Sequence, residues 1–85
     1  MAKKLFVGNL SYTMTDDQLM SVFSAYGKVL SAIIIKDKFS GRSKGFGFVE
    51  FEIDEEAVKA MTELNDSDQD GRKMAVKEAI PRTEN

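Results

Sequence analysis

The residues of this chain with the clearest binding chemistry form one octapeptide, Lys-Gly-Phe-Gly-Phe-Val-Glu-Phe, at positions 44–51. Successive side chains of a β-strand point to opposite faces, so Lys44, Phe46 and Phe48 would share one face. Val49 and Phe51 would share the other face, where their apolar character suits a core. The first face would then present two aromatic rings and a cation to solvent. Flat ligands with negative charges, such as the bases and phosphates of nucleic acids, suit such a face.

A second segment, Leu-Phe-Val-Gly-Asn-Leu at positions 5–10, alternates in a similar way. In a strand, Leu5 and Val7 would point inward, while Phe6 would point outward. Lys4 would flank that ring on the same face. We therefore expect Phe6 and Lys4 to extend the exposed aromatic surface.

The two segments resemble the RNP1 octapeptide and the RNP2 hexapeptide of the RNA-recognition motif family. The octapeptide matches the RNP1 signature at every defined position. The similarity runs from about Lys3 to about Ile80, which is nearly the whole chain. More specifically, the chain resembles the small stand-alone proteins with one such domain that occur in bacteria and organelles.

The residues between the two motifs predict a helix followed by a strand. Thr15 can cap the helix, Gln18 lies three residues on as in a capping box, and Gly27 is a predicted C-terminal stop. The β-branched run Val29–Asp37 predicts a strand, and a polar loop at 38–43 would follow it. By alternation, the outward side chains of this strand would be Ser31, Ile33 and Ile35, and the inward ones Ala32 and Ile34.

After the octapeptide, the pattern predicts a second helix and a last strand. Asp54 would cap this helix, and its apolar stripe would contain Ala57, Val58, Met61 and Leu64. We expect a left-handed residue at Asn65 or Asp66. A turn at Asp70-Gly71 would then lead to a strand from Lys73 to about Ala79, with Met74 and Val76 inward and Ala75 and Lys77 outward.

The resulting order, βαββαβ, is that of the ferredoxin-like α+β fold. It consists of a four-stranded antiparallel sheet with two helices packed on one face, which leaves the other face open. We expect residues 1–80 to form this single domain and residues 81–85 to form a short disordered C-terminal tail.

Composition limits the other possibilities. The 85 residues include no cysteine and no histidine, which removes disulfides, thiolate chemistry and the usual zinc sites. Residues 66–71, Asp-Ser-Asp-Gln-Asp-Gly, open like a calcium loop, but the twelfth position requires Glu and is Lys77. We therefore expect no metal and no cofactor. No apolar run reaches the length of a membrane span or signal peptide, so we expect a cytoplasmic protein without membrane association.

The net charge of −2 is unusual for a protein that binds nucleic acid. The acidic residues fall mostly on the two predicted helices and in the loop at 66–70. Most of the lysines and Arg42 fall on or beside the predicted open face. We therefore expect base stacking to supply more of the affinity than electrostatic attraction.

The resemblance implies specific roles for the outward residues. In the family, rings at the positions of Phe6 and Phe48 each stack a base, and the ring at the position of Phe46 inserts near the sugars. Lys44 would contact a phosphate. The expected RNA-binding residues are Lys4, Phe6, Ile33, Ile35, Arg42, Lys44, Phe46, Phe48 and Lys77.

The other aromatic residues have a simpler interpretation. Phe23, Tyr26 and Phe51 are predicted to lie in the core. Phe39, in the polar loop, is expected to pack against the domain, with an extra ligand contact as the alternative. Arg42 is expected to contact a phosphate, with a solvated surface charge as the alternative.

These features together imply a monomeric protein that binds single-stranded RNA, binds single-stranded DNA similarly or more weakly, and acts in post-transcriptional regulation. A protein–protein interaction module on the same fold is the alternative, although such modules usually lack the RNP aromatic residues. An enzyme of the acylphosphatase type would need an anion-cradling loop, which residues 11–14 do not supply. We expect no enzymatic activity.

Overall fold

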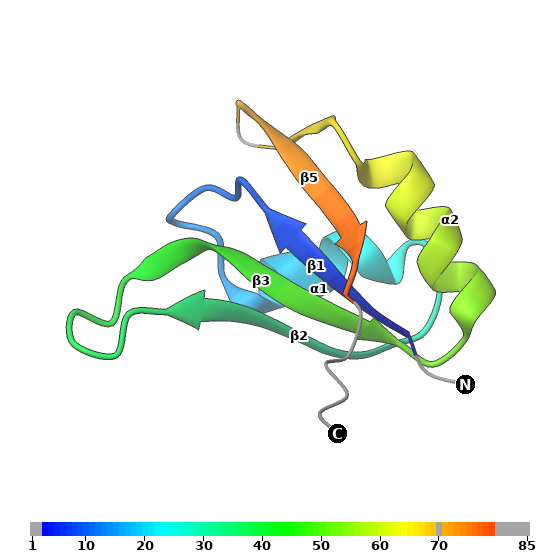
Figure 1. Cartoon of the computed structure of the whole chain (residues 1–85), viewed down its shortest axis with the longest axis horizontal. Helices are drawn as coiled ribbons and strands as arrows, with labels where there is room; N and C mark the ends of the chain where they lie inside the picture. Colours follow the sequence, from blue (N-terminus) through cyan, green and yellow to red (C-terminus); the bar gives the residue numbers. More distant parts are fainter. Residues whose placement is uncertain (1–2, 70, 80–85) are drawn as a thin grey trace, which may run out of the picture.

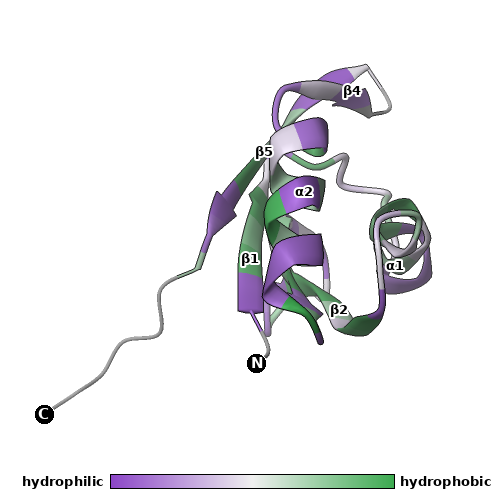
Figure 2. Ribbon diagram, turned by 90° about the vertical axis from the view of Figure 1, so that its right-hand side faces the viewer, coloured by the Kyte–Doolittle hydropathy of each residue, from purple (hydrophilic) through white to green (hydrophobic). Residues whose placement is uncertain are grey.

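The computed structural model describes residues 3–69 and 71–79. Its elements, in chain order, are β1 (Lys3–Gly8), α1 (Asp16–Ser24), β2 (Val29–Lys36), β3 (Ser43–Phe51), α2 (Asp54–Leu64), β4 (Ser67–Gln69) and β5 (Arg72–Glu78). The strands form an antiparallel sheet in the order β2-β3-β1-β5-β4 (Figure 1). Both helices lie on one face of this sheet, and the other face is left uncovered by any described element (Figure 2). This arrangement confirms the ferredoxin-like α+β fold.

The sheet has one strand more than the four that the sequence predicts. The extra strand, β4, spans three residues and pairs with β5. Asp66 adopts the left-handed conformation with φ of 68° and turns the chain back after α2, and Gly71 with φ of 79° closes the hairpin to β5. Aspartate-rich segments have low strand propensity, so the pairing with β5 decides this local structure. The predicted domain end at residue 80 and the predicted tail at 81–85 lie outside the described residues.

The first helix begins at the predicted cap. The Thr15 hydroxyl accepts the Gln18 N–H at 3.1 Å, and the Gln18 side chain accepts the Thr15 N–H at 3.0 Å, which completes a capping box. The helix ends at Ser24, however, so Gly27 is not its stop as predicted. Gly27 instead lies against the side chain of Glu56, and a Cβ at this position would collide with that side chain.

The second helix differs from the prediction at its cap and in its buried stripe. Asp54 is the first helical residue, and the N-cap is Ile53, which makes no side-chain capping bond. Acidic side chains in the first turn still suit the positive end of the helix. Val58, predicted to be inward, is 43% exposed, and Ala60 is buried in its place. The buried positions 57, 60 and 64 therefore follow the three-and-four spacing of one helix face.

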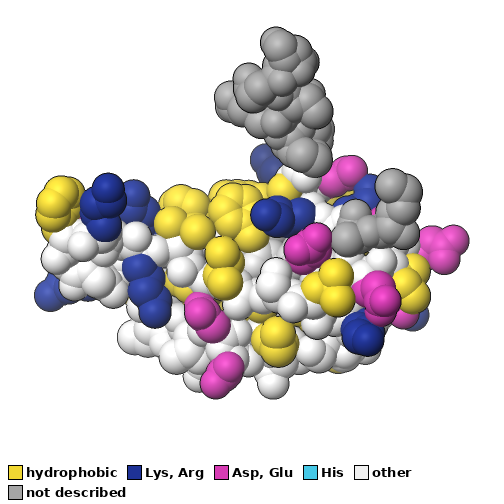
Figure 3. Space-filling model, turned by 90° about the horizontal axis from the view of Figure 1, so that it is seen from below, with side chains coloured by type: hydrophobic (Ala, Val, Ile, Leu, Met, Phe, Trp, Pro, Cys, Tyr) yellow, Lys and Arg dark blue, Asp and Glu magenta, His cyan; other side chains and the backbone are white. Residues whose placement is uncertain are grey.

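The hairpin loop between β2 and β3 is organised by one carboxylate. Asp37 Oδ1 accepts the Phe39 N–H at 2.7 Å and the Ser40 N–H at 3.4 Å, and the Gly41 N–H donates to the Asp37 carbonyl at 2.8 Å. The Phe39 ring is 93% exposed, so the prediction that it packs against the domain is wrong. The hydrogen bonds close the loop on itself, so the Phe39 ring does not fold back onto an apolar surface of the domain. Lysine, arginine and hydrophobic side chains gather at this end of the molecule, on the left of Figure 3.

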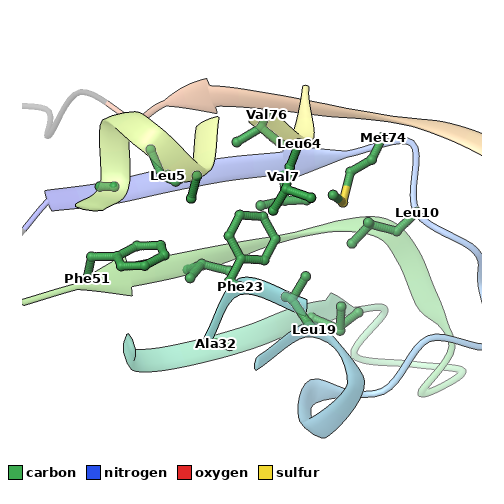
Figure 4. Close-up of a cluster of buried hydrophobic side chains, with 14 of the residues drawn as sticks. Leu5, Val7, Leu10, Leu19, Phe23, Ala32, Phe51, Leu64, Met74 and Val76 are labelled. Atoms are coloured by element: carbon green, nitrogen blue, oxygen red, sulfur yellow. The ribbon is translucent and has the colours of Figure 1, made fainter. Parts of the chain in front are cut away.

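The core lies between the sheet and the helices (Figure 4). Side chains from β1 and β3 meet Phe23 of α1 there, and the Phe23 and Phe51 rings pack edge to face with centroids 6.2 Å apart. The predicted inward residues Ala32, Ile34, Met74 and Val76 are all buried, whereas Tyr26 is only partly buried. Within the described residues, neither helix has the length and hydropathy needed to cross a membrane.

Truncation of two phenylalanines, Phe51 and Phe39, should change the stability of this domain by very different amounts. Phe51→Ala leaves a cavity in the core and should lower the free energy of unfolding by about 3–5 kcal/mol. Phe39→Ala removes a solvated ring and should change it by less than about 0.5 kcal/mol. Urea unfolding followed by circular dichroism measures both values. A comparable loss in the two variants would show that the Phe39 ring packs on the domain.

The hairpin loop should also depend on pH. The backbone N–H groups of Phe39 and then Ser40, together with the charge of Lys44, hold the pKa of Asp37 below its ordinary value of 3.8. Because folding lowers this pKa, the ionised carboxylate stabilises the folded loop, and that contribution is lost as the pH falls through the folded-state pKa. A titration of the Asp37 carboxyl carbon by nuclear magnetic resonance (NMR) should give a midpoint below 3.8. A midpoint at or above that value would contradict the loop geometry.

Candidate nucleic-acid interface

Three phenylalanine rings form a cluster on the uncovered face of the sheet, and we call Phe6, Phe46 and Phe48 the aromatic platform. Phe6 on β1 and Phe48 on β3 are direct partners in the antiparallel register. Their ring centroids lie 5.8 Å apart, and those of Phe6 and Phe46 lie 5.6 Å apart. All three residues are partly buried, so they contact one another while part of each remains accessible. The platform therefore offers neighbouring apolar surfaces to a flat ligand.

The orientation of these rings follows from the burial of their neighbours. Leu5, Val7 and Val49 are completely buried on the helix side of β1 and β3. Alternation along each strand then requires Phe6 and Phe48 to point to the opposite side. A one-residue slip would expose the core residues and bury the platform, so the hydrophobic core fixes the platform.

The predicted border residues lie around the platform. Ile33 on β2 is the register partner of Phe48, and its side chain is 47% exposed. Lys77 on β5 is the register partner of Phe6 and is also exposed. Ile35 is partly buried two residues beyond Ile33 on the same strand. Strands on both sides of the platform thus contribute to one surface.

Cations accompany the rings. The Lys4 Nζ lies 5.7 Å from the centroid of the Phe48 ring, within the range of a cation–π contact. Lys44 is exposed near the start of β3, and Arg42 is exposed in the adjoining hairpin loop. In the described part of the chain, none of these three residues forms an ion pair with a carboxylate, whereas Lys3, Lys28 and Lys73 each do. The cations near the platform are therefore available to a negatively charged ligand.

Gly45 separates Lys44 from the platform within β3. Its φ is 86°, and the register of β3 against β2 shifts between Ile34 and Lys36. Such a bulge bends the strand and redirects nearby side chains. Lys44 precedes this irregularity in β3, and Arg42 lies in the adjoining loop, so both belong to the hairpin end of the strand.

Tyr12, for which the sequence predicts no role, lies on the surface. Tyr12 is 63% exposed, and the Arg72 guanidinium carbon lies 5.4 Å from its ring centroid. An aromatic residue in the polar run Ser11–Thr13 was a signal for an exposed ring. Among the described residues, no group of three or more acidic, histidine or cysteine side chains is placed to hold a metal ion.

Comparison with known proteins agrees with this geometry. Residues 5–75 match the RNA recognition motif family. The chain is 48% identical over 82 residues to Glycine-rich RNA-binding protein 1 of Mycosarcoma maydis, and this match covers 96% of the chain and 47% of that protein. It is 48% identical over 79 residues to the chloroplastic 29 kDa ribonucleoprotein of Arabidopsis thaliana, and this match covers 93% of the chain and 23% of that protein.

The chain thus spans about half or less of the length of these relatives. Both come from eukaryotes, so they give no support to the more specific resemblance to small bacterial proteins. Among solved structures, RNA Binding Protein PG1 is 45% identical and superposes with a TM-score of 0.91, over 96% of this chain and 99% of that one. The motifs, the fold and the matched residues lead to one conclusion: this chain belongs to the RNA recognition motif family.

Proposed function

We propose that this domain binds single-stranded RNA by stacking bases on the aromatic platform. The observation that carries the proposal is the direct cross-strand pairing of Phe6 and Phe48 on a sheet face that no described element covers. Unstacked bases of single strands can lie on such rings. The relatives named RNA-binding protein and ribonucleoprotein support the same function.

Each site residue has a role in this proposal. Phe6 and Phe48 each stack one base, and Phe46 contacts the sugars between them. Ile33 and Ile35 form an apolar border along β2. The proposed phosphate contacts and polar border are Lys4, Arg42, Lys44 and Lys77. Stacking contributes about 1–3 kcal/mol per base, so two stacked bases are compatible with micromolar affinity.

The platform supports binding more than catalysis or peptide capture. The platform rings suit stacking on bases, and the aliphatic and cationic side chains at its border suit contacts with bases and phosphates. Protein–protein modules on this fold usually lack the RNP aromatic residues, whereas all three are present in this chain. We therefore propose a binding domain without enzymatic activity, and we propose that it acts as a monomer.

The wider role is also a proposal. The matched relatives are longer than this chain, so their names describe proteins of which this domain is one part. We propose a role in post-transcriptional regulation, which begins with RNA binding. The cytoplasmic location stays a prediction from sequence, since one relative is chloroplastic.

The first test of the platform is removal of one stacking ring. Phe48→Ala should weaken binding to a short single-stranded RNA by about 1–3 kcal/mol, because one base loses its stacking partner. The fold should remain cooperative, since the ring lies outside the core. Val58→Ala on the helix side is the matched control and should leave affinity unchanged. Isothermal titration and thermal unfolding measure the two properties.

An unchanged affinity in folded Phe48→Ala protein would refute the platform mechanism. Loss of cooperative unfolding in that variant would instead show that Phe48 belongs to the core.

The second test concerns the kind of nucleic acid. Single-stranded DNA of matching sequence should bind within about tenfold of RNA, or about 1.4 kcal/mol, because stacking on Phe6 and Phe48 does not depend on the sugar. A hairpin duplex should bind more weakly than both, since a flat sheet cannot enter the deep groove of A-form RNA. Titrations with the three oligonucleotides provide the comparison. Tighter binding of the duplex would contradict the proposed mode.

A further inference from the structure

We propose that a pocket beside the β2–β3 hairpin binds one further nucleotide of an RNA strand that already occupies the aromatic platform. The inference rests on the proposed function and extends it to a second site. The pocket has a volume of about 510 Å³ and lies between the hairpin and the segment that joins β1 to α1. None of the three platform rings lines it. Pockets of this size accommodate small organic ligands.

One wall of the pocket suits a base. Tyr12 contributes a ring that is 63% exposed, and Met14 contributes a buried apolar surface. The Tyr12 ring has Arg72 on it, at 5.4 Å from the centroid. A Cβ at Gly45 would come within 3.1 Å of the Tyr12 ring edge. The ring is thus supported by its surroundings before any ligand binds, which lowers the entropic cost of stacking on it.

The other wall suits a phosphate. Lys36 and Arg42 both line the pocket, and neither forms an ion pair with any carboxylate in residues 3–69 and 71–79. Asp37 follows Lys36 in the sequence and Asp16 follows Thr15 of the pocket, and both carboxylates already accept backbone hydrogen bonds. Asp37 accepts backbone N–H groups of its own loop, and Asp16 accepts the Ile34 N–H at 2.8 Å. The two cations are therefore left for a ligand.

Two hydroxyl groups add donors to the same pocket. Thr15 Oγ1 accepts the Gln18 N–H at 3.1 Å, and Ser43 Oγ accepts the Gly45 N–H at 3.0 Å. Each oxygen accepts a hydrogen bond, which leaves its own hydrogen to donate. The cations and hydroxyl donors of this pocket suit a phosphate and its aromatic ring suits a base, which are two parts of one nucleotide.

The pocket adjoins the platform along one strand. Ser43 lines the pocket, Lys44 is exposed next to it, and Phe46 belongs to the platform. Ser43 alternates to the face opposite Lys44 and Phe46, so an RNA strand that leaves the platform past Phe46 and Lys44 would turn around the hairpin end of the sheet to reach the pocket. A platform of this family holds two or three bases, so only a longer strand would reach the pocket.

The test compares RNA pools of two lengths, about three and about six nucleotides, the shorter matched to the platform. A longer RNA binds the platform more tightly simply because it offers more positions at which it can bind. The wild-type protein should bind the longer RNA more tightly than this number of positions explains. Tyr12→Ala should weaken the longer RNA about tenfold, or about 1.4 kcal/mol, and leave the shorter one unchanged. Phe39→Ala is the matched control, because it removes another exposed ring from the same hairpin end but does not line the pocket.

Three outcomes would overturn the pocket assignment. These are no gain in affinity with length, an equal effect of Tyr12→Ala on both RNAs, and loss of the gain in Phe39→Ala but not in Tyr12→Ala. Failure of the wild-type protein to bind the shorter RNA would instead refute the proposed function itself.

A separate arm distinguishes a strand from a free nucleotide as the ligand. Adenosine monophosphate should shift the NMR amide signals of Thr13, Thr15 and Ser43 only weakly and at high concentration. If it binds as tightly as the longer RNA and competes with it, the ligand is a free nucleotide and the strand assignment is wrong. Thermal unfolding of Tyr12→Ala should match the wild type, which shows that any lost affinity does not come from misfolding.

Discussion

The arrangement of the surface depends on the pairing of β1 with β3 in one register. Leu5 and Val49 are partners on the helix side, and Phe6 and Phe48 are partners on the open side. Burial of the first pair drives folding, since each fully buried aliphatic side chain contributes about 1.5–3 kcal/mol. The same backbone hydrogen bonds then hold the second pair together at 5.8 Å between ring centroids. The binding surface is thus preorganised by interactions that a ligand never touches.

Departures from regular strand geometry shape the edge of that surface. The left-handed Gly45 ends the flat part of β3 and allows the hairpin to bend toward the segment that carries Tyr12. The Asp37 carboxylate closes the hairpin loop on itself. These two features create a pocket with free cations next to a platform of rings.

Charge is distributed so that a chain with a net charge of −2 can still attract an anion. Lys3, Lys28 and Lys73 are paired with carboxylates. The lysines and the arginine around the platform have no such partners among the described residues. Since exposed pairs contribute at most about 1 kcal/mol each to stability, leaving these cations unpaired costs the fold little. In the proposed binding mode, attraction of a phosphate is local and stacking carries the larger share of the affinity.

Alternation and helix capping were local enough to be determined by the sequence alone: they predicted the order of elements, the inward and outward residues of β1, β2 and β3, and the capping box at Thr15. The short strand β4, the exposure of Phe39 and the burial of Ala60 were decided by tertiary structure. Each depends on what lies opposite in space. The strand β5 supplies a pairing partner for β4, whereas the closed hairpin leaves the Phe39 ring without a packing partner. Helix α2 buries Ala60 and leaves Val58 exposed. The pocket beside Tyr12 has the same origin, because its walls come from segments some 20 residues or more apart that no local pattern brings together.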